Sequence, residues 1–104
     1  MRKELLILLL FLAACSSVNI DTSVKPGDEG FVVGGGQTSL ILTHGLSSTP
    51  CEVKDLANYL AAKNITVYAV RLAGHGTSVE DLTTKKWEDW YQSYKEAYLT
   101  LKPM

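Results

Sequence analysis

Two short apolar runs on either side of an amphipathic stretch constrain the fold of this chain more than any other feature. Residues 39–43 and 65–70 are too short for helices and lie between turn-forming residues, so we predict buried strands, the first buried on both faces. Between them, apolar residues recur at spacings of three and four, which predicts a helix with one stripe against a sheet: Val53, Leu56, Ala57, Leu60 and Ala61. This order is typical of a βαβ unit with parallel strands.

The ends of this helix carry recognisable signals. Thr49-Pro50-Cys51-Glu52 predicts a capping box, with proline at the first helical position where its missing N–H costs nothing. Asn64 tolerates the left-handed conformation that closes a helix before the next strand. We therefore expect a helix from Pro50 to about residue 63.

The remaining elements are shorter or less distinct. We predict a strand at 31–33, a tight glycine turn at 34–36, a loop at 71–78 and a second amphipathic helix at 86–102. The second helix carries an aromatic stripe, for which we favour core packing over a ligand or membrane surface: Trp87, Trp90, Tyr91, Tyr94, Tyr98 and Leu101.

The amino terminus predicts export and lipid anchoring. Two basic residues precede an apolar run that is about half as long as the roughly 20 residues of a spanning helix. Leu12-Ala13-Ala14-Cys15 resembles the lipobox of bacterial lipoproteins, which predicts a signal peptide at 1–14 and a lipid on Cys15. Ordinary cleavage that leaves Cys15 as a free thiol is the alternative. We expect a tether at 15–30, a domain at 31–104, and a protein held at a membrane of the bacterial cell envelope.

The charge distribution excludes nucleic acid as a partner, and the cysteine count bears on disulfides. The chain has 104 residues and a net charge of -1, with acidic and basic residues interspersed, so it offers no basic surface for nucleic acid. With a lipid on Cys15, Cys51 would have no cysteine left to pair with. We expect at most one small domain, without a disulfide framework.

Four separated segments carry a family resemblance. They are residues 40–46 (Leu-Ile-Leu-Thr-His-Gly-Leu), 49–50 (Thr-Pro), 72–78 (Leu-Ala-Gly-His-Gly-Thr-Ser) and 87–91 (Trp-Glu-Asp-Trp-Tyr). In order and spacing they resemble the opening part of carboxylesterases and monoacylglycerol lipases of the α/β-hydrolase family. The resemblance implies the amino-terminal part of that α/β fold, with parallel strands, flanking helices and an incomplete sheet. It also implies hydrolysis of short acyl esters or monoglycerides by a serine nucleophile, with no cofactor.

The resemblance assigns roles to individual residues. The backbone N–H of Leu46 would donate to the oxyanion that forms during ester cleavage, and Gly45 would permit the sharp turn before it. His44 and the loop Gly74-His75-Gly76 would support and shape the site, without either histidine acting as the catalytic base. Both histidines could equally well do no more than hydrogen-bond within their loops. Neither has a second ligand at metal-binding spacing, so we expect no metal.

The catalytic groups themselves are not among these residues. The sequence contains no Gly-x-Ser-x-Gly elbow and no histidine after His75. We therefore expect an amino-terminal fragment, inactive alone, whose carboxyl-terminal half is missing or separately encoded. The strand at 40–43 would lack a neighbour on one side, which predicts marginal stability or aggregation. The alternative is a non-catalytic envelope lipoprotein with a binding or structural role.

Overall fold

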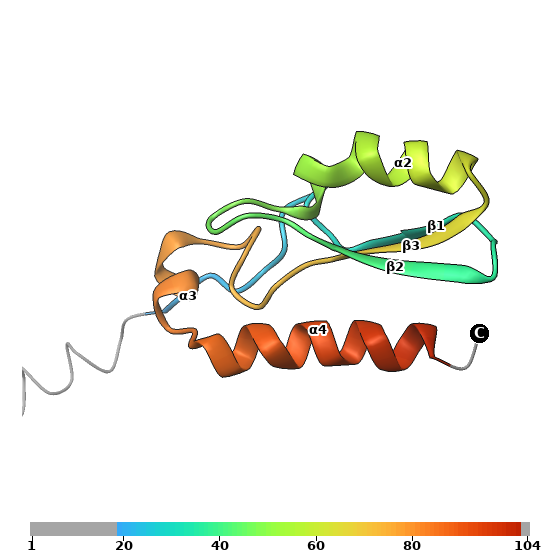
Figure 1. The fold of residues 1–104 in the computed structure, drawn as a ribbon. Helices are drawn as coiled ribbons and strands as arrows, with labels where there is room; N and C mark the ends of the chain where they lie inside the picture. The colour runs from blue at the N-terminus through green and yellow to red at the C-terminus, as the bar shows by residue number, and fades with distance from the viewer. Residues whose placement is uncertain (1–18, 103–104) are drawn as a thin grey trace, which may run out of the picture.

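A computed structural model describes residues 19–102, and the signal peptide, Cys15 and the start of the tether lie outside them. Its helices and strands form three layers, with a sheet between two helices (Figure 1). The strands are β1 (Phe31–Val33), β2 (Thr38–Thr43) and β3 (Ile65–Val70). The helices are the 3-10 turn η1 (Pro50–Val53), α2 (Lys54–Ala62), α3 (Val79–Thr83) and α4 (Trp87–Leu101).

The sheet has the strand order β1-β3-β2. β2 pairs in parallel with β3, from Thr38 opposite Ile65 to Thr43 opposite Val70, which confirms the predicted βαβ unit. β1 runs antiparallel to β3, so the sheet is mixed, and the expectation of parallel strands holds for one pair only. β3 is the central strand, and its side chains Val67, Ala69 and Val70 are buried.

β2 lies at an edge of the sheet, as the sequence predicted, because its other side has no strand among residues 19–102. The prediction that β2 is buried on both faces is wrong, since Leu40 is 38% exposed. An edge strand has a neighbour on one side only, and here that neighbour is β3.

The glycine segment 34–36 carries the chain past the end of β3, from one edge of the sheet to the other, instead of making a hairpin turn. A Cβ placed on Gly36 would lie 1.6 Å from the carbonyl oxygen of Asn64, so only glycine fits this crossing. Asn64 itself has a φ of 64°, which confirms that it closes α2 in the left-handed conformation.

Three further expectations were wrong in detail. Thr49 makes no side-chain cap bond, and the helix begins instead as a 3-10 turn, so there is no capping box at this position. The short helix α3 was not expected, although Ser78 caps it by accepting a hydrogen bond from the N–H of Asp81. Leu56 is about half exposed, at 49%, and Ala57 is the α2 residue that is fully buried.

The prediction that the aromatic stripe of α4 packs in the core holds for two of its residues only: Leu101 is buried, and Trp90 packs against His75. Trp87, Tyr91, Tyr94 and Tyr98 are exposed, while the buried residues of the helix are Ala97 and Leu101. Trp90, Ala97 and Leu101 are spaced seven and four residues apart, so at 3.6 residues per turn they share one face of the helix, and that face is turned inward. No helix within residues 19–102 has the length and apolar character needed to cross a bilayer.

Candidate functional site

The loops that follow β2 and β3 meet at one end of the sheet. Because the two strands are parallel neighbours, their carboxyl ends lie side by side, and the loops 44–49 and 71–78 begin next to each other. The rings of His44 and His75 pack against each other there, with centroids 4.7 Å apart. The structure thus brings together the two loops that the sequence singled out.

His44 is buried, and both nitrogens of its ring are engaged. Nδ1 donates to the carbonyl oxygen of Gly45 at 2.8 Å, and Nε2 accepts from the N–H of Leu72 at 3.1 Å. This pair of bonds requires the neutral ring with its proton on Nδ1. Burial lowers the pKa of His44 below its ordinary value, which also favours the neutral ring. His44 ties the two loops together and has no free nitrogen for proton transfer.

His75 is more deeply buried, at 2% exposure, but is less well satisfied. Nδ1 donates to the carbonyl oxygen of Ala73 at 3.2 Å, and Nε1 of Trp90 donates to the same oxygen at 3.1 Å. Nε2 has no hydrogen-bond partner within residues 19–102. The ring packs edge-on against Trp90, with centroids 5.8 Å apart. His75 therefore packs between the ring of His44 on the first loop and Trp90 on α4.

The loop that carries Leu46 is a fixed turn. The N–H of Ser48 donates to the carbonyl oxygen of Gly45 at 3.1 Å, and Ser47 adopts a positive φ of 57°. We expected Gly45 to allow the sharp turn, but the left-handed residue is Ser47. Leu46 is 71% exposed at the tip, and no hydrogen bond within residues 19–102 uses its N–H. A backbone donor is therefore free on a turn held from both sides.

Glu52 is a supporting residue that the sequence reasoning misassigned. Its carboxylate accepts a hydrogen bond from the N–H of Gly45 at 3.2 Å, across the base of the turn. Hydrogen bonds from the Ser48 hydroxyl and the Gly45 N–H lower the pKa of Glu52, which keeps the carboxylate ionised. Its spacing from Thr49 had suggested a capping box, but the acceptor is used for the turn 45–48 instead.

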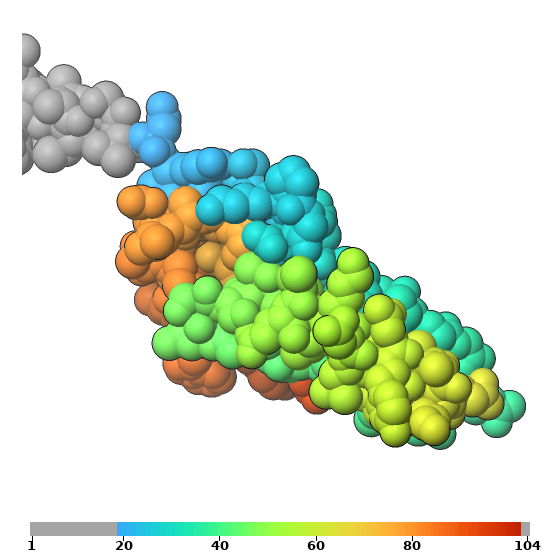
Figure 2. Space-filling model, turned by 90° about the horizontal axis from the view of Figure 1, so that it is seen from above, coloured from blue at the N-terminus to red at the C-terminus, as the bar shows by residue number. Residues whose placement is uncertain are grey.

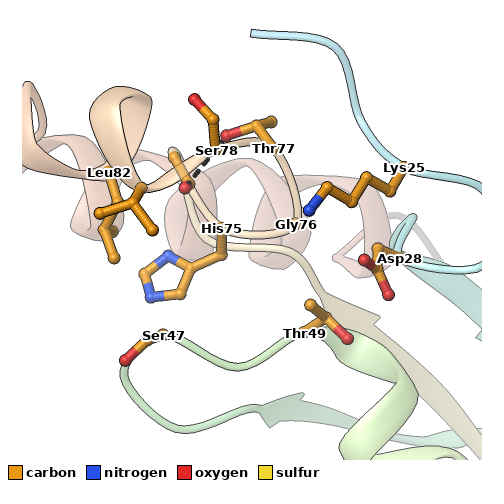
Figure 3. Close-up of a pocket in the computed structure, with 11 residues that line it drawn as sticks. Lys25, Asp28, Ser47, Thr49, His75, Gly76, Thr77, Ser78 and Leu82 are labelled. Carbon is orange, nitrogen blue, oxygen red and sulfur yellow. Dashed lines mark hydrogen bonds between the residues drawn. The ribbon is translucent and has the colours of Figure 1, made fainter. Parts of the chain in front are cut away.

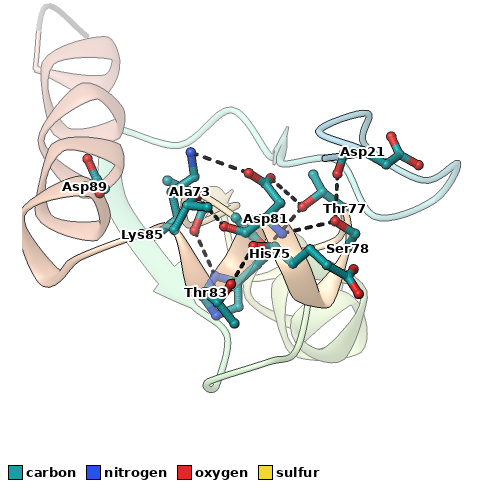
Figure 4. Close-up of polar contacts among 12 residues, drawn as sticks. Asp21, Ala73, His75, Thr77, Ser78, Asp81, Thr83, Lys85 and Asp89 are labelled. Atoms are coloured by element: carbon teal, nitrogen blue, oxygen red, sulfur yellow. Dashed lines mark hydrogen bonds and ion pairs between the residues drawn. The ribbon is translucent and has the colours of Figure 1, made fainter. Parts of the chain in front are cut away.

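The second loop is held by polar contacts on several sides (Figure 4). The hydroxyl of Thr77 donates to the buried carboxylate of Asp81 at 2.6 Å, and Lys85 lies 3.6 Å from the same carboxylate. Arg71 donates to the carbonyl oxygen of His75 at 3.0 Å. Gly74 and Gly76 both have positive φ, which accounts for a glycine on each side of the histidine.

The described part of the expected tether lies against this loop and is not a free spacer there (Figure 2). The N–H of Lys25 donates to the carbonyl oxygen of Gly76 at 2.9 Å, and the hydroxyl of Ser78 donates to that of Asp21 at 2.7 Å. A Cβ on Gly76 would lie 2.9 Å from the Cβ of Asp28. The domain boundary at residue 30 stays a prediction.

A pocket of about 180 Å³ opens between the two loops and this segment, and His75 and Ser47 line it from opposite sides (Figure 3). Within residues 19–102, no hydrogen bond joins a serine or cysteine to a histidine, and no cluster of metal-binding side chains forms. Cys51 is a free, exposed thiol. The described residues therefore offer a donor for an anionic oxygen, without a paired nucleophile and base.

Nε2 is hydrogen-bonded in His44 but not in His75, and this difference yields a prediction about stability. His44→Phe leaves the N–H of half-buried Leu72 without an acceptor, so we expect the free energy of unfolding to fall by roughly 1–3 kcal/mol. His75→Phe removes an unpaired acceptor, and the Ala73 oxygen keeps its bond from Trp90, so we expect a change of less than about 1 kcal/mol. Urea unfolding followed by circular dichroism measures both, and equal losses would contradict the assignment.

The lowered pKa of His44 yields a second prediction. The unfolded chain takes up a proton near the ordinary histidine value of 6.5, whereas the folded chain does so only at lower pH. The stability from neutral His44 is therefore complete above about pH 6.5 and lost as the pH falls through the folded pKa. As the pH is lowered from about 8 to about 5, the urea concentration at the unfolding midpoint should fall more steeply for the wild type than for His44→Phe. Parallel pH profiles would count against a lowered pKa.

Known proteins share this segment and this arrangement. The chain is 38% identical over 79 residues to the thermostable monoacylglycerol lipase of Bacillus sp. (strain H-257), which covers 76% of this chain and 32% of the lipase. It is 32% identical over 72 residues to the carboxylesterase of Bacillus subtilis (strain 168), covering 69% of this chain and 29% of the esterase. The chain thus spans about a third of the length of these relatives.

A solved structure agrees with the sequence relatives. It comes from work on LipS and LipT, two metagenome-derived lipolytic enzymes, and superimposes with a TM-score of 0.73 at 28% sequence identity. The match covers 78% of this chain and 33% of the solved one, and its sheet with flanking helices corresponds to the fold described above. No family model matches the sequence. Because the two sequence relatives and the solved structure agree, we conclude that the chain belongs to the carboxylesterase-like α/β-hydrolase family.

Proposed function

We propose that this chain supplies the oxyanion-binding loop of a carboxylic ester hydrolase of the lipase or esterase type. The observation that carries the proposal is the free N–H of Leu46, exposed at the tip of a turn that His44 and Glu52 hold in place. The ester-hydrolase names of the two Bacillus relatives support it independently.

The chemistry explains why such a turn is useful. Attack on an ester carbonyl places negative charge on the carbonyl oxygen, and a donor already aimed at that oxygen stabilises the transition state. A donor on a mobile loop would have to be ordered at each turnover, whereas the turn 45–48 is fixed by the bonds of Gly45 to Ser48 and Glu52. The N–H of Leu46 therefore suits this role.

The nucleophile, the acid and the base are a separate part of the proposal. These 104 residues contain no Gly-x-Ser-x-Gly elbow, and both ring nitrogens of His44 are occupied. We infer that the serine, acid and histidine belong to a further part of the hydrolase, so that the chain alone does not turn over esters. The substrates would be carboxylic esters such as short acyl esters or monoacylglycerols.

We also propose that the chain is anchored at the bacterial cell envelope by a lipid on Cys15. The support is the sequence pattern at 12–15, which lies outside the described residues. Several acyl chains on one cysteine, at about 0.8 kcal/mol per buried methylene, would hold the protein at a bilayer without a spanning helix. An ester hydrolase placed there would meet lipid-derived esters directly.

A chimera tests the proposed oxyanion role. Residues 31–101 replace the matching segment of the Bacillus sp. monoacylglycerol lipase, and hydrolysis of a short-chain p-nitrophenyl ester is measured. Leu46→Pro removes the N–H, so we expect kcat to fall by about 10²–10³. Leu46→Ala keeps the N–H and is the matched control, expected to stay within about fivefold of the unmutated chimera.

Two results would each contradict one part of the proposal, the first the oxyanion role of Leu46 and the second the inactivity of the chain alone. One is turnover by the folded Leu46→Pro chimera at the rate of Leu46→Ala, because the N–H would then be dispensable. The other is turnover by the 104-residue chain alone above buffer and denatured-protein blanks, because its residues would then hold a nucleophile.

Metabolic labelling tests the anchor. The full chain expressed in a bacterium should incorporate labelled palmitate and sediment with membranes, and Cys15→Ala should abolish both, since the thiol is the acceptor of the lipid. Cys51→Ala is the control and should leave both unchanged. Undiminished labelling of Cys15→Ala would rule out the proposed lipid site.

A further inference from the structure

The segment before β1 is bound to the second loop, so its course along the domain is fixed. The hydroxyl of Ser78 donates to the carbonyl oxygen of Asp21 at 2.7 Å, and the N–H of Lys25 donates to that of Gly76 at 2.9 Å. We name residues 21–28 the strap. Its first residue is therefore held at the end of the sheet where the two loops lie, which we call the loop end (Figure 1).

The strap shortens the distance that the proposed lipid anchor can span. Cys15 and Asp21 are six residues apart in the sequence. A chain covers at most about 3.3–3.6 Å per residue, so covalent geometry alone keeps Asp21 within roughly 20 Å of the anchored cysteine. A tether that ran free to residue 30 would allow roughly 50 Å. The bonds of the strap therefore more than halve the reach of the domain above the bilayer.

This length limits how the domain can face the bilayer. β3 has six residues, so the two ends of the sheet are about 20 Å apart at roughly 3.3 Å per residue. Lys63 lies at the far end, just before β3. If the far end faced the bilayer, Asp21 would be raised by about the full reach of the tether, which would have to be completely extended at a cost in conformational entropy. With the loop end toward the bilayer, no such extension is needed.

Two exposed apolar side chains flank the bond between the strap and the second loop. Ile20 precedes Asp21 and is 41% exposed, and Val79 follows Ser78 and is 73% exposed. Two aliphatic side chains would bind a bilayer only weakly, but a covalent anchor makes the contact intramolecular and raises its effective concentration. Asp21 and Glu80 are acidic neighbours, so the contact would depend on apolar burial and not on attraction to anionic lipid.

We propose that the strap turns the loop end of the domain toward the bilayer, with Ile20 and Val79 in contact with the lipid surface. This inference rests on the proposed lipid at Cys15. The partner is the bilayer itself. The lipid supplies the attachment, and the bonds of the strap set which end of the domain faces the membrane.

The orientation decides where a substrate would arrive. Lys25 of the strap and Ser47 of the first loop line the same pocket, and Val79 lines it too, so the pocket lies beside the proposed membrane contact (Figure 3). Leu46, which carries the proposed oxyanion donor, directly precedes Ser47. The donor would therefore lie close to esters that partition into the bilayer.

Fluorescence quenching by lipid tests the orientation. The full chain with Cys51→Ala is expressed in a bacterium, purified with its lipid and reconstituted into phosphatidylcholine vesicles that contain a lipid with a nitroxide head group. A bimane label is attached at Val79→Cys or, as the matched control, at Lys63→Cys, both of which are exposed positions. We expect quenching at residue 79 to be at least about threefold stronger than at residue 63, because the two lie at opposite ends of the sheet.

Two changes to the amino-terminal segment separate its contributions. A flexible Gly-Ser insert of about 15 residues after Ser17 lengthens the tether, so quenching at residue 79 should fall toward that at residue 63. Ile20→Asp removes one apolar contact and should lower quenching at residue 79 at least about twofold. Thr22→Asp adds the same charge at an exposed polar position two residues away, and should change the quenching less than Ile20→Asp does.

Several results would overturn the orientation: equal quenching at residues 79 and 63, stronger quenching at 63, or equal effects of Ile20→Asp and Thr22→Asp. Palmitate labelling is measured on the same samples. A labelled chain with equal quenching at both positions would count against the orientation alone. A chain without lipid would count against the proposed anchor, and against this inference with it. Ester turnover by the chimera bears on neither.

Discussion

The parallel pairing of β2 with β3 is the interaction on which the rest of the structure depends. It sets the carboxyl ends of two strands side by side, so that two loops from distant parts of the sequence start next to each other. The packing of His44 against His75 and the bond from Leu72 to His44 both follow from that placement. Without this register the turn that carries Leu46 would lose its tie to the second loop through His44, and would keep only the local bonds of Gly45 to Ser48 and Glu52.

The two histidines show how one environment gives two different outcomes. Each donates from Nδ1 to a nearby carbonyl oxygen, but only His44 finds a donor for Nε2. A buried acceptor without a partner costs stability, whereas a satisfied one fixes both the tautomer and the loop. The bond network thus makes His44 a link between loops, and leaves His75 to act mainly through the packing of its ring against Trp90.

Periodicity predicted the elements whose pattern is local. The βαβ order, the Asn64 helix end and the span of α4 follow from apolar spacing and single-residue conformational preferences. The antiparallel direction of β1 and the exposure of Trp87, Tyr91, Tyr94 and Tyr98 depend on contacts between distant residues, and the bond from Gly45 to Glu52 depends on how the turn 45–48 folds back on the helix start. An amphipathic stripe shows that a helix has a partner, but does not show which segment supplies it. The positive φ of Ser47 had no signal in the sequence, because a serine carries no preference for it.

The same strand, β2, forms the open edge of the sheet and leads into the fixed turn 45–48. β2 ends in the turn that carries Leu46, so the strand that lacks a neighbour is the one that positions the proposed oxyanion donor. His44, Glu52 and the Ser48 bond hold that turn from within the described residues, without help from the open side of β2. The donor is therefore organised by the described residues themselves, and the nucleophile of the proposed reaction would not have to build the turn as well. A site divided in this way separates stabilisation of the oxyanion from nucleophilic attack, and each part can be tested on its own.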